Sequence, residues 1–212
     1  MAKCRYVVLK NFVDCEQQQC LTSSVGCDLI ESPAGESSIG LDLHLPYHGG
    51  PISSPFILDI FKHAFVAASK EYEDTGDDDI AKQVLAPSYT DLTGIALVYG
   101  PHGKMIAHHD SPVVPGRKFE WLAMITVGEA VQFTVDDEHV VLFSGDAMVM
   151  DAQSVLHGVD KVIHDPTKET CVGLPIDSRL GVLVWTALEP RIVKVDYDDC
   201  LYMDGLFVTD EE

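Results

Sequence analysis

The sequence has 212 residues, of which 46% are hydrophobic and 23% charged, as is typical of one soluble globular domain. Its 14 basic and 34 acidic residues give a net charge of −20, which disfavours tight, non-specific binding to nucleic acid and favours a protein, a small molecule or a basic partner. No apolar run reaches the roughly 18–20 residues of a membrane span, and the stretch MAKCRYVVLKNF has too short an apolar core for a secretory signal. We therefore expect no membrane association and a cytoplasmic or nuclear location.

The N-terminal part predicts a strand, a helix and a long loop. A short apolar run predicts a strand over Tyr6–Leu9, and Asp14 suits the N-cap of a helix of about three turns. Residues 24–53 are rich in Gly, Ser and Pro, which predicts a loop with one edge strand near residues 41–45. We expect this loop to act as a lid that reads the substrate.

A second helix is predicted over residues 55–72. Ser54 is a good N-cap, and Pro55 suits the first helical position. Apolar residues then recur at helical spacing, namely Ile57, Leu58, Phe61, Phe65 and Ala68. The acidic residues 73–79 that follow predict a solvated turn.

From Leu92 onward, short apolar runs rich in Val, Ile, Phe and Thr follow one another. The strands predicted from them cover residues 94–99, 104–109, 121–127, 131–135, 140–143, 147–150, 156–163 and 180–188. This spacing predicts a mainly β fold with flanking helices, a double-stranded β-helix (jelly roll) with the N-terminal helices on one face. We expect one domain over residues 1–212, with helices and lid in 1–91, the jelly-roll core in 92–188 and an acidic tail in 189–212.

The six cysteines form no CxxC pair, which favours free, reduced thiols. A zinc site built from Cys15, Cys20 and Cys27 is a weaker alternative, because this spacing suits no common zinc module.

The stretch YGPHGKMIAHHD, from Tyr99 to Asp110, carries the most informative chemistry. Residues two apart on a strand share a face, so His108 and Asp110 can point into one cavity while His109 points away. The third ligand of a metal triad would be His157, which follows a buried strand and precedes Gly158. The other downstream candidates, His139 and His164, are expected in exposed loops.

Two histidines and one carboxylate leave three metal positions open, which suits non-haem Fe(II) with O2 and a bidentate co-substrate. The usual co-substrate is 2-oxoglutarate, whose distal carboxylate needs a buried cation. Arg179 opens the last predicted strand and is a candidate for this role, because a guanidinium binds a carboxylate bidentately. The phenol of Tyr99 could donate to the same ligand.

These motifs together resemble the AlkB-type Fe(II)/2-oxoglutarate dioxygenases. The resemblance implies that His108, Asp110 and His157 bind iron, and that Arg179 and Tyr99 contact 2-oxoglutarate. It implies hydroxylation or oxidative demethylation of a substrate, with succinate and CO2 as co-products. The segments that carry it are YGPHGKMIAHHD, VLFSGDAMVMDAQSVLHGV and SRLGVLV, with Asn11–Asp14 as a similar entry segment.

The sequence departs from the nucleic-acid repair members of this family at three positions. Leu97 stands in place of an Asn, Trp185 in place of a second Arg, and Pro112 in place of an acidic residue that reads the damaged base. We therefore expect a protein or small-molecule substrate, with a methylated-base demethylase as the alternative. A further alternative is a non-catalytic jelly-roll binding protein.

Overall fold

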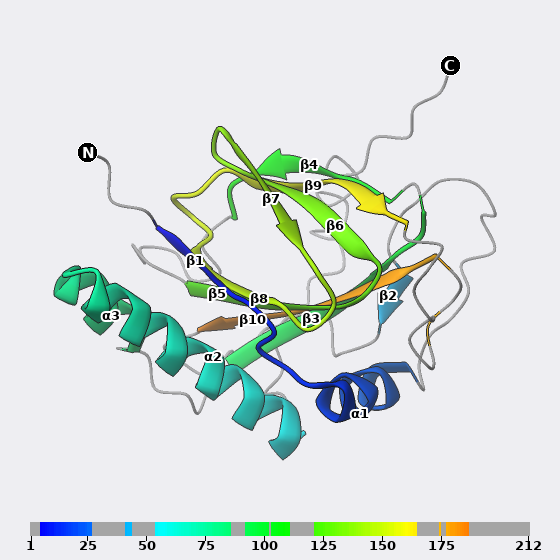
Figure 1. The fold of residues 1–212 in the computed structure, drawn as a ribbon, viewed down its shortest axis with the longest axis horizontal. Coiled ribbons are helices and arrows are strands. Elements are labelled where there is room, and N and C mark those ends of the chain that lie inside the picture. Colours follow the sequence, from blue (N-terminus) through cyan, green and yellow to red (C-terminus); the bar gives the residue numbers. More distant parts are fainter. Residues whose placement is uncertain are drawn as a thin grey trace, which may run out of the picture.

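The structure, a computed structural model, describes residues 5–26, 41–43, 54–85, 92–101, 103–110, 121–164, 174 and 177–186. In this part of the chain two antiparallel sheets lie face to face (Figure 1). The larger sheet has the order β1 (Tyr6–Leu9), β8 (Ala147–Asp151), β5 (Trp121–Gly128), β10 (Arg179–Thr186), β3 (Leu92–Tyr99), β2 (Leu41–Leu43). The smaller has the order β4 (Met105–His108), β9 (His157–Ile163), β6 (Ala130–Val135), β7 (Glu138–Leu142). The predicted jelly-roll architecture is confirmed.

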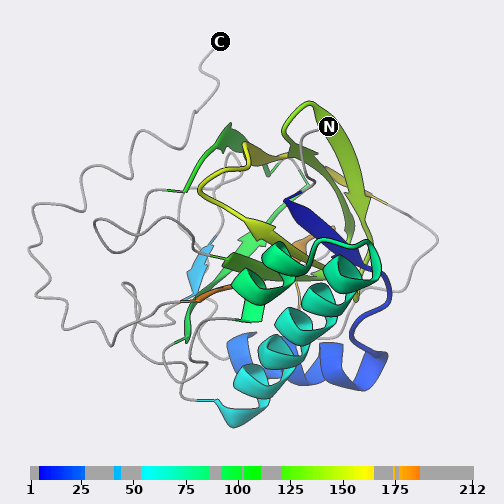
Figure 2. The same cartoon turned by 90° about the vertical axis from the view of Figure 1, so that its left-hand side faces the viewer.

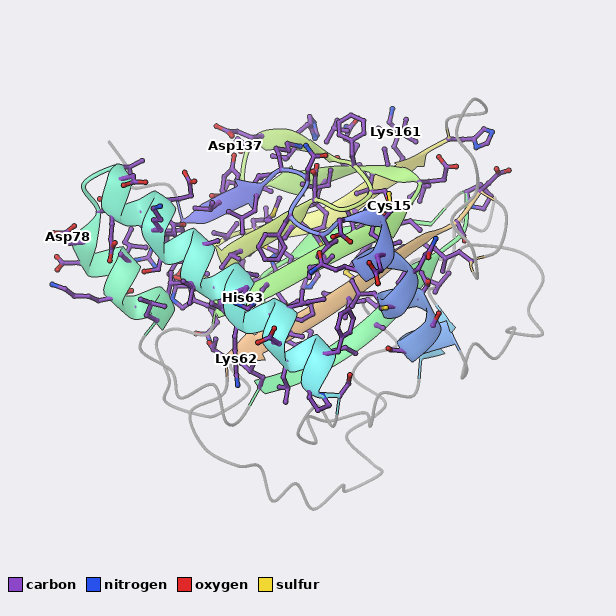
Figure 3. The ribbon with its side chains drawn as sticks, turned by 60° about the horizontal axis from the view of Figure 1, so that its bottom comes forward. Cys15, Lys62, His63, Asp78, Asp137 and Lys161 are labelled. Atoms are coloured by element: carbon purple, nitrogen blue, oxygen red, sulfur yellow. The ribbon has the colours of Figure 1, made fainter. Side chains whose placement is uncertain are left out.

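Helices cover the larger sheet on the side away from the smaller one (Figure 2). Helix α2 (Pro55–Asp74) packs against β1, β5 and β8, and α3 (Asp78–Leu85) packs against α2. Figure 3 shows α2 lying across this sheet, with the exposed His63 on its outer side. Among the described helices, none has the length and apolar character that crossing a bilayer requires.

Helix α2 forms where the sequence predicts it. The Ser54 side chain accepts a hydrogen bond from the backbone N–H of Ile57 at 3.4 Å, and Pro55 occupies the first turn. Its buried face repeats every three or four residues, through Ile57, Ile60, Phe61, Ala64, Phe65, Ala68, Ser69 and Tyr72.

The predicted solvated turn over residues 73–79 is partly wrong, because α3 begins inside it. Asp78 and Asp79 occupy the first turn of α3, where negative charges interact favourably with the positive end of the helix dipole. Its inner face buries Ile80, Ala81 and Val84 against α2. The acidic run that suggested a loop is thus a helix start.

Helix α1 (Cys15–Gly26) begins at the predicted cap. The Asp14 carboxylate accepts the Gln17 backbone N–H at 2.8 Å, and the Gln17 side-chain carbonyl accepts the Asp14 N–H at 3.0 Å. This reciprocal pair is a capping box, which satisfies two N–H groups that the helix itself cannot. Cys15, labelled in Figure 3, and Cys20 are free and exposed on this helix, whereas Cys27 lies outside the described residues.

Asp146 joins the entry of the chain to the barrel. Its buried carboxylate accepts the backbone N–H groups of Asn11 and Phe143, both at 2.9 Å, and pairs with the Lys10 ammonium at 2.8 Å. Gly145 precedes it with a φ of +89°, which a residue with a Cβ adopts only at a cost. The turn at residues 144–145 thus also anchors the segment before α1.

The central strand β5 is buried on both faces, and its side chains alternate between two cores. Trp121, Ala123, Ile125 and Val127 belong to the core beneath the helices. Leu122 and Met124 belong to the core between the two sheets, which we call the barrel interior. The helices cover the other face of this sheet, so a site inside the jelly roll has to be formed by side chains that point into the barrel interior.

Several predictions fall outside the described residues. They concern most of the lid region 24–53, the tail 189–212 and Pro112. From the lid region, the end of α1 and the edge strand β2 are described, and β2 lies where an edge strand was predicted. The subdivision of the domain stays a prediction.

Candidate metal centre

The two predicted histidine ligands lie opposite each other on neighbouring strands. His108 is the last residue of β4 and His157 the first of β9, and the two are register partners. Directly opposed residues on one face of an antiparallel pair bring their side chains into contact. The two imidazole centroids are accordingly 4.5 Å apart, with His157 buried and His108 half-buried.

A bulge in β4 sets this pairing. Met105 pairs with Val159 and His108 with His157, so three residue steps on β4 match two on β9. On a regular strand, residues three apart would point to opposite faces. The extra residue lets both Met105 and His108 face the barrel interior, as bulges beside functional sites often do.

Asp110 completes the group from the segment just after β4. Its backbone N–H donates to the Ala152 carbonyl at 2.9 Å, which holds the segment against the end of β8. One carboxylate oxygen, Oδ1, lies 3.3 Å from Nε2 of His108 and 3.5 Å from Nε2 of His157. The three candidate ligand atoms all lie within 4.8 Å of one another, as a two-histidine, one-carboxylate centre requires.

Hydrogen bonds on the far side of each ring fix which nitrogen faces Asp110. Nδ1 of His108 lies 2.9 Å from the Ile106 carbonyl, and Nδ1 of His157 lies 3.0 Å from the Val155 carbonyl. A carbonyl only accepts, so each Nδ1 carries a proton, and Nε2 is the nitrogen that each ring turns towards the carboxylate. Lone pairs and a carboxylate at these distances attract a cation, either a proton or a metal ion.

The titration behaviour of the group agrees with that electrostatic picture. The hydrogen bond with Asp110 raises the pKa of His108, against the opposing effect of burial. Burial alone would raise the pKa of Asp110, but hydrogen bonds from His108, His157 and Trp185 outweigh it and hold that pKa well below its usual range. The carboxylate therefore stays ionised at neutral pH and is ready to bind a metal.

Gly158 lets β4 lie close to β9. A Cβ at this position would stand 2.7 Å from the Met105 carbonyl oxygen and 2.8 Å from the Cα of Ala107. Both are backbone atoms, so β4 itself would have to move, and His108 would move with it.

We expect Gly158→Ala to lower metal affinity at least about tenfold, as misplaced metal ligands do, and to cost about 1–3 kcal/mol of stability through overpacking. Equilibrium dialysis against cobalt(II) and thermal unfolding measure the two effects. Gly100→Ala is the matched control, because a Cβ there meets nothing within 4 Å. Equal cobalt affinity in the two variants would contradict the expectation.

Arg179 is a second charged group that faces the barrel interior. It opens β10 as predicted and is 0% exposed. Its Nε donates to the Thr126 hydroxyl at 2.6 Å and its Nη2 to the Met124 sulfur at 3.4 Å, while Nη1 has no hydrogen-bond partner among the described residues. Burial lowers the pKa of Arg179 to about 10, so the guanidinium stays charged at neutral pH. A buried cation with an unused N–H suits an anion that enters from outside the protein.

The Arg179 side chain leans along its own strand towards the metal group. A Cβ at Gly181 would lie 3.5 Å from Nη2 of Arg179, so the guanidinium passes over this glycine in the direction of Trp185. Trp185, further along the same face of β10, donates its indole N–H to Oδ2 of Asp110 at 2.7 Å. The candidate anion site and the candidate metal site thus share one side of one strand.

Tyr99 faces Arg179 from the adjacent strand. The two are register partners, and the guanidinium carbon lies 5.3 Å from the centre of the tyrosine ring. The phenol lies 3.9 Å from the Met105 sulfur. Burial raises the pKa of Tyr99 to about 12, against the opposing effect of Arg179, so the phenol remains a neutral donor.

The remaining histidine candidates lie elsewhere. His139 is exposed, as expected, but on strand β7 rather than in a loop, and its Nδ1 lies 2.9 Å from Asp160. His164 follows β9 and lies 3.0 Å from Asp177 and 3.6 Å from Glu129. Since Ile163 pairs with Ala130 and His157 with Val135, His164 and the metal group stand at opposite ends of β9.

The sequence predicts no role in the site for Trp185 or Thr126. Trp185 is notable in the sequence only as the residue that replaces the second arginine of the repair members. Thr126 looks like any strand threonine, yet it lies one strand from Arg179 and accepts its Nε–H. The signal that could have found Thr126 is its even spacing from Met124, which places both on the face of β5 that meets the barrel interior.

The fold is similar to several solved structures at low sequence identity. OsALKBH1 is 16% identical, with a TM-score of 0.58 over 88% of this chain and 100% of that one. A Pseudomonas putida prolyl-4-hydroxylase is 15% identical, with a TM-score of 0.52 over 89% and 95%. An oxidoreductase of the 2OG-Fe(II) oxygenase family from Burkholderia pseudomallei is 12% identical, with a TM-score of 0.52 over 87% and 85%. No protein-family model and no curated protein matches the sequence. The chain thus has the double-stranded β-helix fold of these proteins.

Proposed function

We propose that this protein is an AlkB-like, Fe(II)- and 2-oxoglutarate-dependent dioxygenase that hydroxylates or oxidatively demethylates its substrate. The observation that carries the proposal is the pair of incomplete sites in the barrel interior. One is a group of two imidazoles and a carboxylate that attracts a cation, and the other is a buried guanidinium with an unused N–H. Fe(II) and 2-oxoglutarate would satisfy both at once.

The chain's own residues would divide the work as follows. His108, Asp110 and His157 hold the metal from one side and leave its other positions open, because the described residues supply three ligands. Arg179 binds the distal carboxylate of 2-oxoglutarate, and Tyr99 offers a neutral phenol beside it. When bound, the metal and 2-oxoglutarate supply the oxidation of a substrate C–H bond by O2, with succinate and CO2 as co-products. The apolar interior excludes bulk water from this chemistry.

For the substrate, we favour a protein or a small molecule. The net charge of −20 opposes a polyanion, and a neutral indole occupies the position where the repair members of the family carry a second arginine. The similarity to a prolyl-4-hydroxylase supports a protein substrate, and the similarity to OsALKBH1 supports demethylation of a methylated base as the second candidate.

The experiment is anaerobic addition of Fe(II) and then 2-oxoglutarate to the full chain. We expect a visible charge-transfer absorption, followed on admission of O2 by slow conversion of 2-oxoglutarate to succinate. A proline-containing peptide and a methylated single-stranded oligonucleotide, each assayed for stimulated succinate release, separate the substrate classes. If the absorption band and succinate formation are both absent, the dioxygenase proposal is wrong and the non-catalytic binding protein is favoured.

A further inference from the structure

We propose that Trp185 is a positioning residue that holds Asp110 as a one-oxygen metal ligand. This inference rests on the proposed function, since it concerns the same metal centre. Trp185 is not itself a candidate ligand. It acts through the Asp110 carboxylate, to which its indole N–H donates.

The two oxygens of Asp110 have different surroundings. Oδ1 faces both imidazoles, at 3.3 Å from His108 Nε2 and 3.5 Å from His157 Nε2. Oδ2 accepts the indole N–H of Trp185 at 2.7 Å, a short hydrogen bond to a charged acceptor. Because Oδ1 faces the two imidazoles and the indole bond fixes Oδ2, the carboxylate is oriented to offer Oδ1 to a metal.

The indole is carried by an inner strand of the larger sheet. Trp185 lies on β10, a strand paired on both sides, and its register partners are Leu122 on β5 and Thr93 on β3. Asp110, by contrast, lies beyond the end of β4, where its backbone has one recorded hydrogen bond, to Ala152. The indole therefore transfers the rigidity of the central sheet to a ligand that its own strand does not fix.

The donor is also neutral, which affects the charge of the centre. An arginine or lysine at this place would neutralise much of the carboxylate's charge, whereas an indole N–H leaves most of it directed at the metal. Removing the indole should therefore weaken the metal site through loss of orientation, with no change in net charge.

The sequence contains two tryptophans, so replacing one leaves the other as the single source of indole fluorescence. Trp121 points the other way from β5, into the core beneath the helices, where its ring lies 5.9 Å from that of Tyr72. Trp121→Phe thus leaves Trp185 as the sole indole, and Trp185→Phe leaves Trp121. The two are matched substitutions of one residue type on opposite faces of the same sheet.

The experiment titrates each variant with cobalt(II) alone, following fluorescence and counting bound metal by equilibrium dialysis. In Trp121→Phe we expect wild-type cobalt affinity and strong quenching, because the remaining indole touches a metal ligand. In Trp185→Phe we expect little quenching and an affinity lower by about 10- to 100-fold, the usual effect of losing a partner of a metal ligand. Trp185→His, which keeps a ring N–H donor, should recover part of the affinity.

Three results would overturn the inference. They are equal cobalt affinity in the two phenylalanine variants, absence of quenching in Trp121→Phe despite bound cobalt, and no recovery in a folded Trp185→His. In the first and third results the wild type still binds cobalt near Trp185, so the dioxygenase proposal stands. Bound cobalt that leaves Trp185 unquenched would lie away from Asp110 and count against both proposals. Absence of cobalt binding by the wild type would instead overturn both. If Trp185→Phe fails to fold, the quenching of Trp121→Phe, in which Trp185 is native, still decides.

Discussion

Arg179→Met is expected to weaken 2-oxoglutarate binding by at least about 30-fold while leaving the protein at least as stable as the wild type. Truncating one partner of a buried charge pair costs about 2–5 kcal/mol, or roughly 30-fold to several-thousand-fold in affinity. In the free protein the same guanidinium is fully buried with one N–H unused among the described residues. Replacing buried charged groups by well-packed apolar side chains is often neutral, or stabilising by about 1–4 kcal/mol.

Calorimetric titration of the cobalt-loaded protein with 2-oxoglutarate measures the first effect, and thermal unfolding of the free protein measures the second. Arg179→Lys is the control, because it keeps the buried charge but loses the two-pronged geometry. It should weaken binding without any gain in stability. A methionine variant that unfolds more easily and binds 2-oxoglutarate normally would show that Arg179 serves the fold instead.

His157→Ala is expected to lower metal affinity by more than about 100-fold, since loss of outer partners alone costs roughly 10- to 100-fold. The imidazole is buried and supplies one of only three ligand atoms in the described centre. It also stacks near Phe133, with centroids 6.3 Å apart, so some loss of stability accompanies the change.

His139→Ala is the matched control for this variant. His139 is likewise a strand histidine beside an aspartate, with Nδ1 2.9 Å from Asp160, but it is exposed and away from the barrel interior. Equilibrium dialysis against cobalt(II) should show wild-type affinity for His139→Ala. Retention of the metal by a folded His157→Ala would remove this residue from the centre.

Most of the fold could be predicted from the sequence because periodicity reports burial directly. Ser54-Pro55 and the apolar row after it gave α2, and the short β-branched runs gave the strands within a few residues. Helix α3 is absent from the prediction because acidic residues such as Asp78 and Asp79 suit a solvated turn as well as a helix start. Composition alone does not separate these two uses of negative charge.

The candidate site was predictable in its members but not in its geometry. The order of His108, Asp110, His157 and Arg179 along the chain suggested one pocket, and the structure brings the first three within reach of one another. The indole bond of Trp185 joins residues 75 positions apart, so it depends on which strands meet. A short sequence motif does not show which residues so far apart will meet. Trp185, which replaces the second arginine of the repair members, contacts the site through a hydrogen bond of its own.

The bulge in β4 makes chain length, as well as side-chain identity, a requirement of the site. It allows Met105, beside the Tyr99 phenol, and His108, in the metal group, to face inward from one short strand. Deleting a single residue between them would leave both sheets able to pair, yet would turn one of the two outward. Over evolution, then, substitutions could retune either half of the pocket, whereas an insertion or deletion in these few residues would separate the two halves while the fold survives.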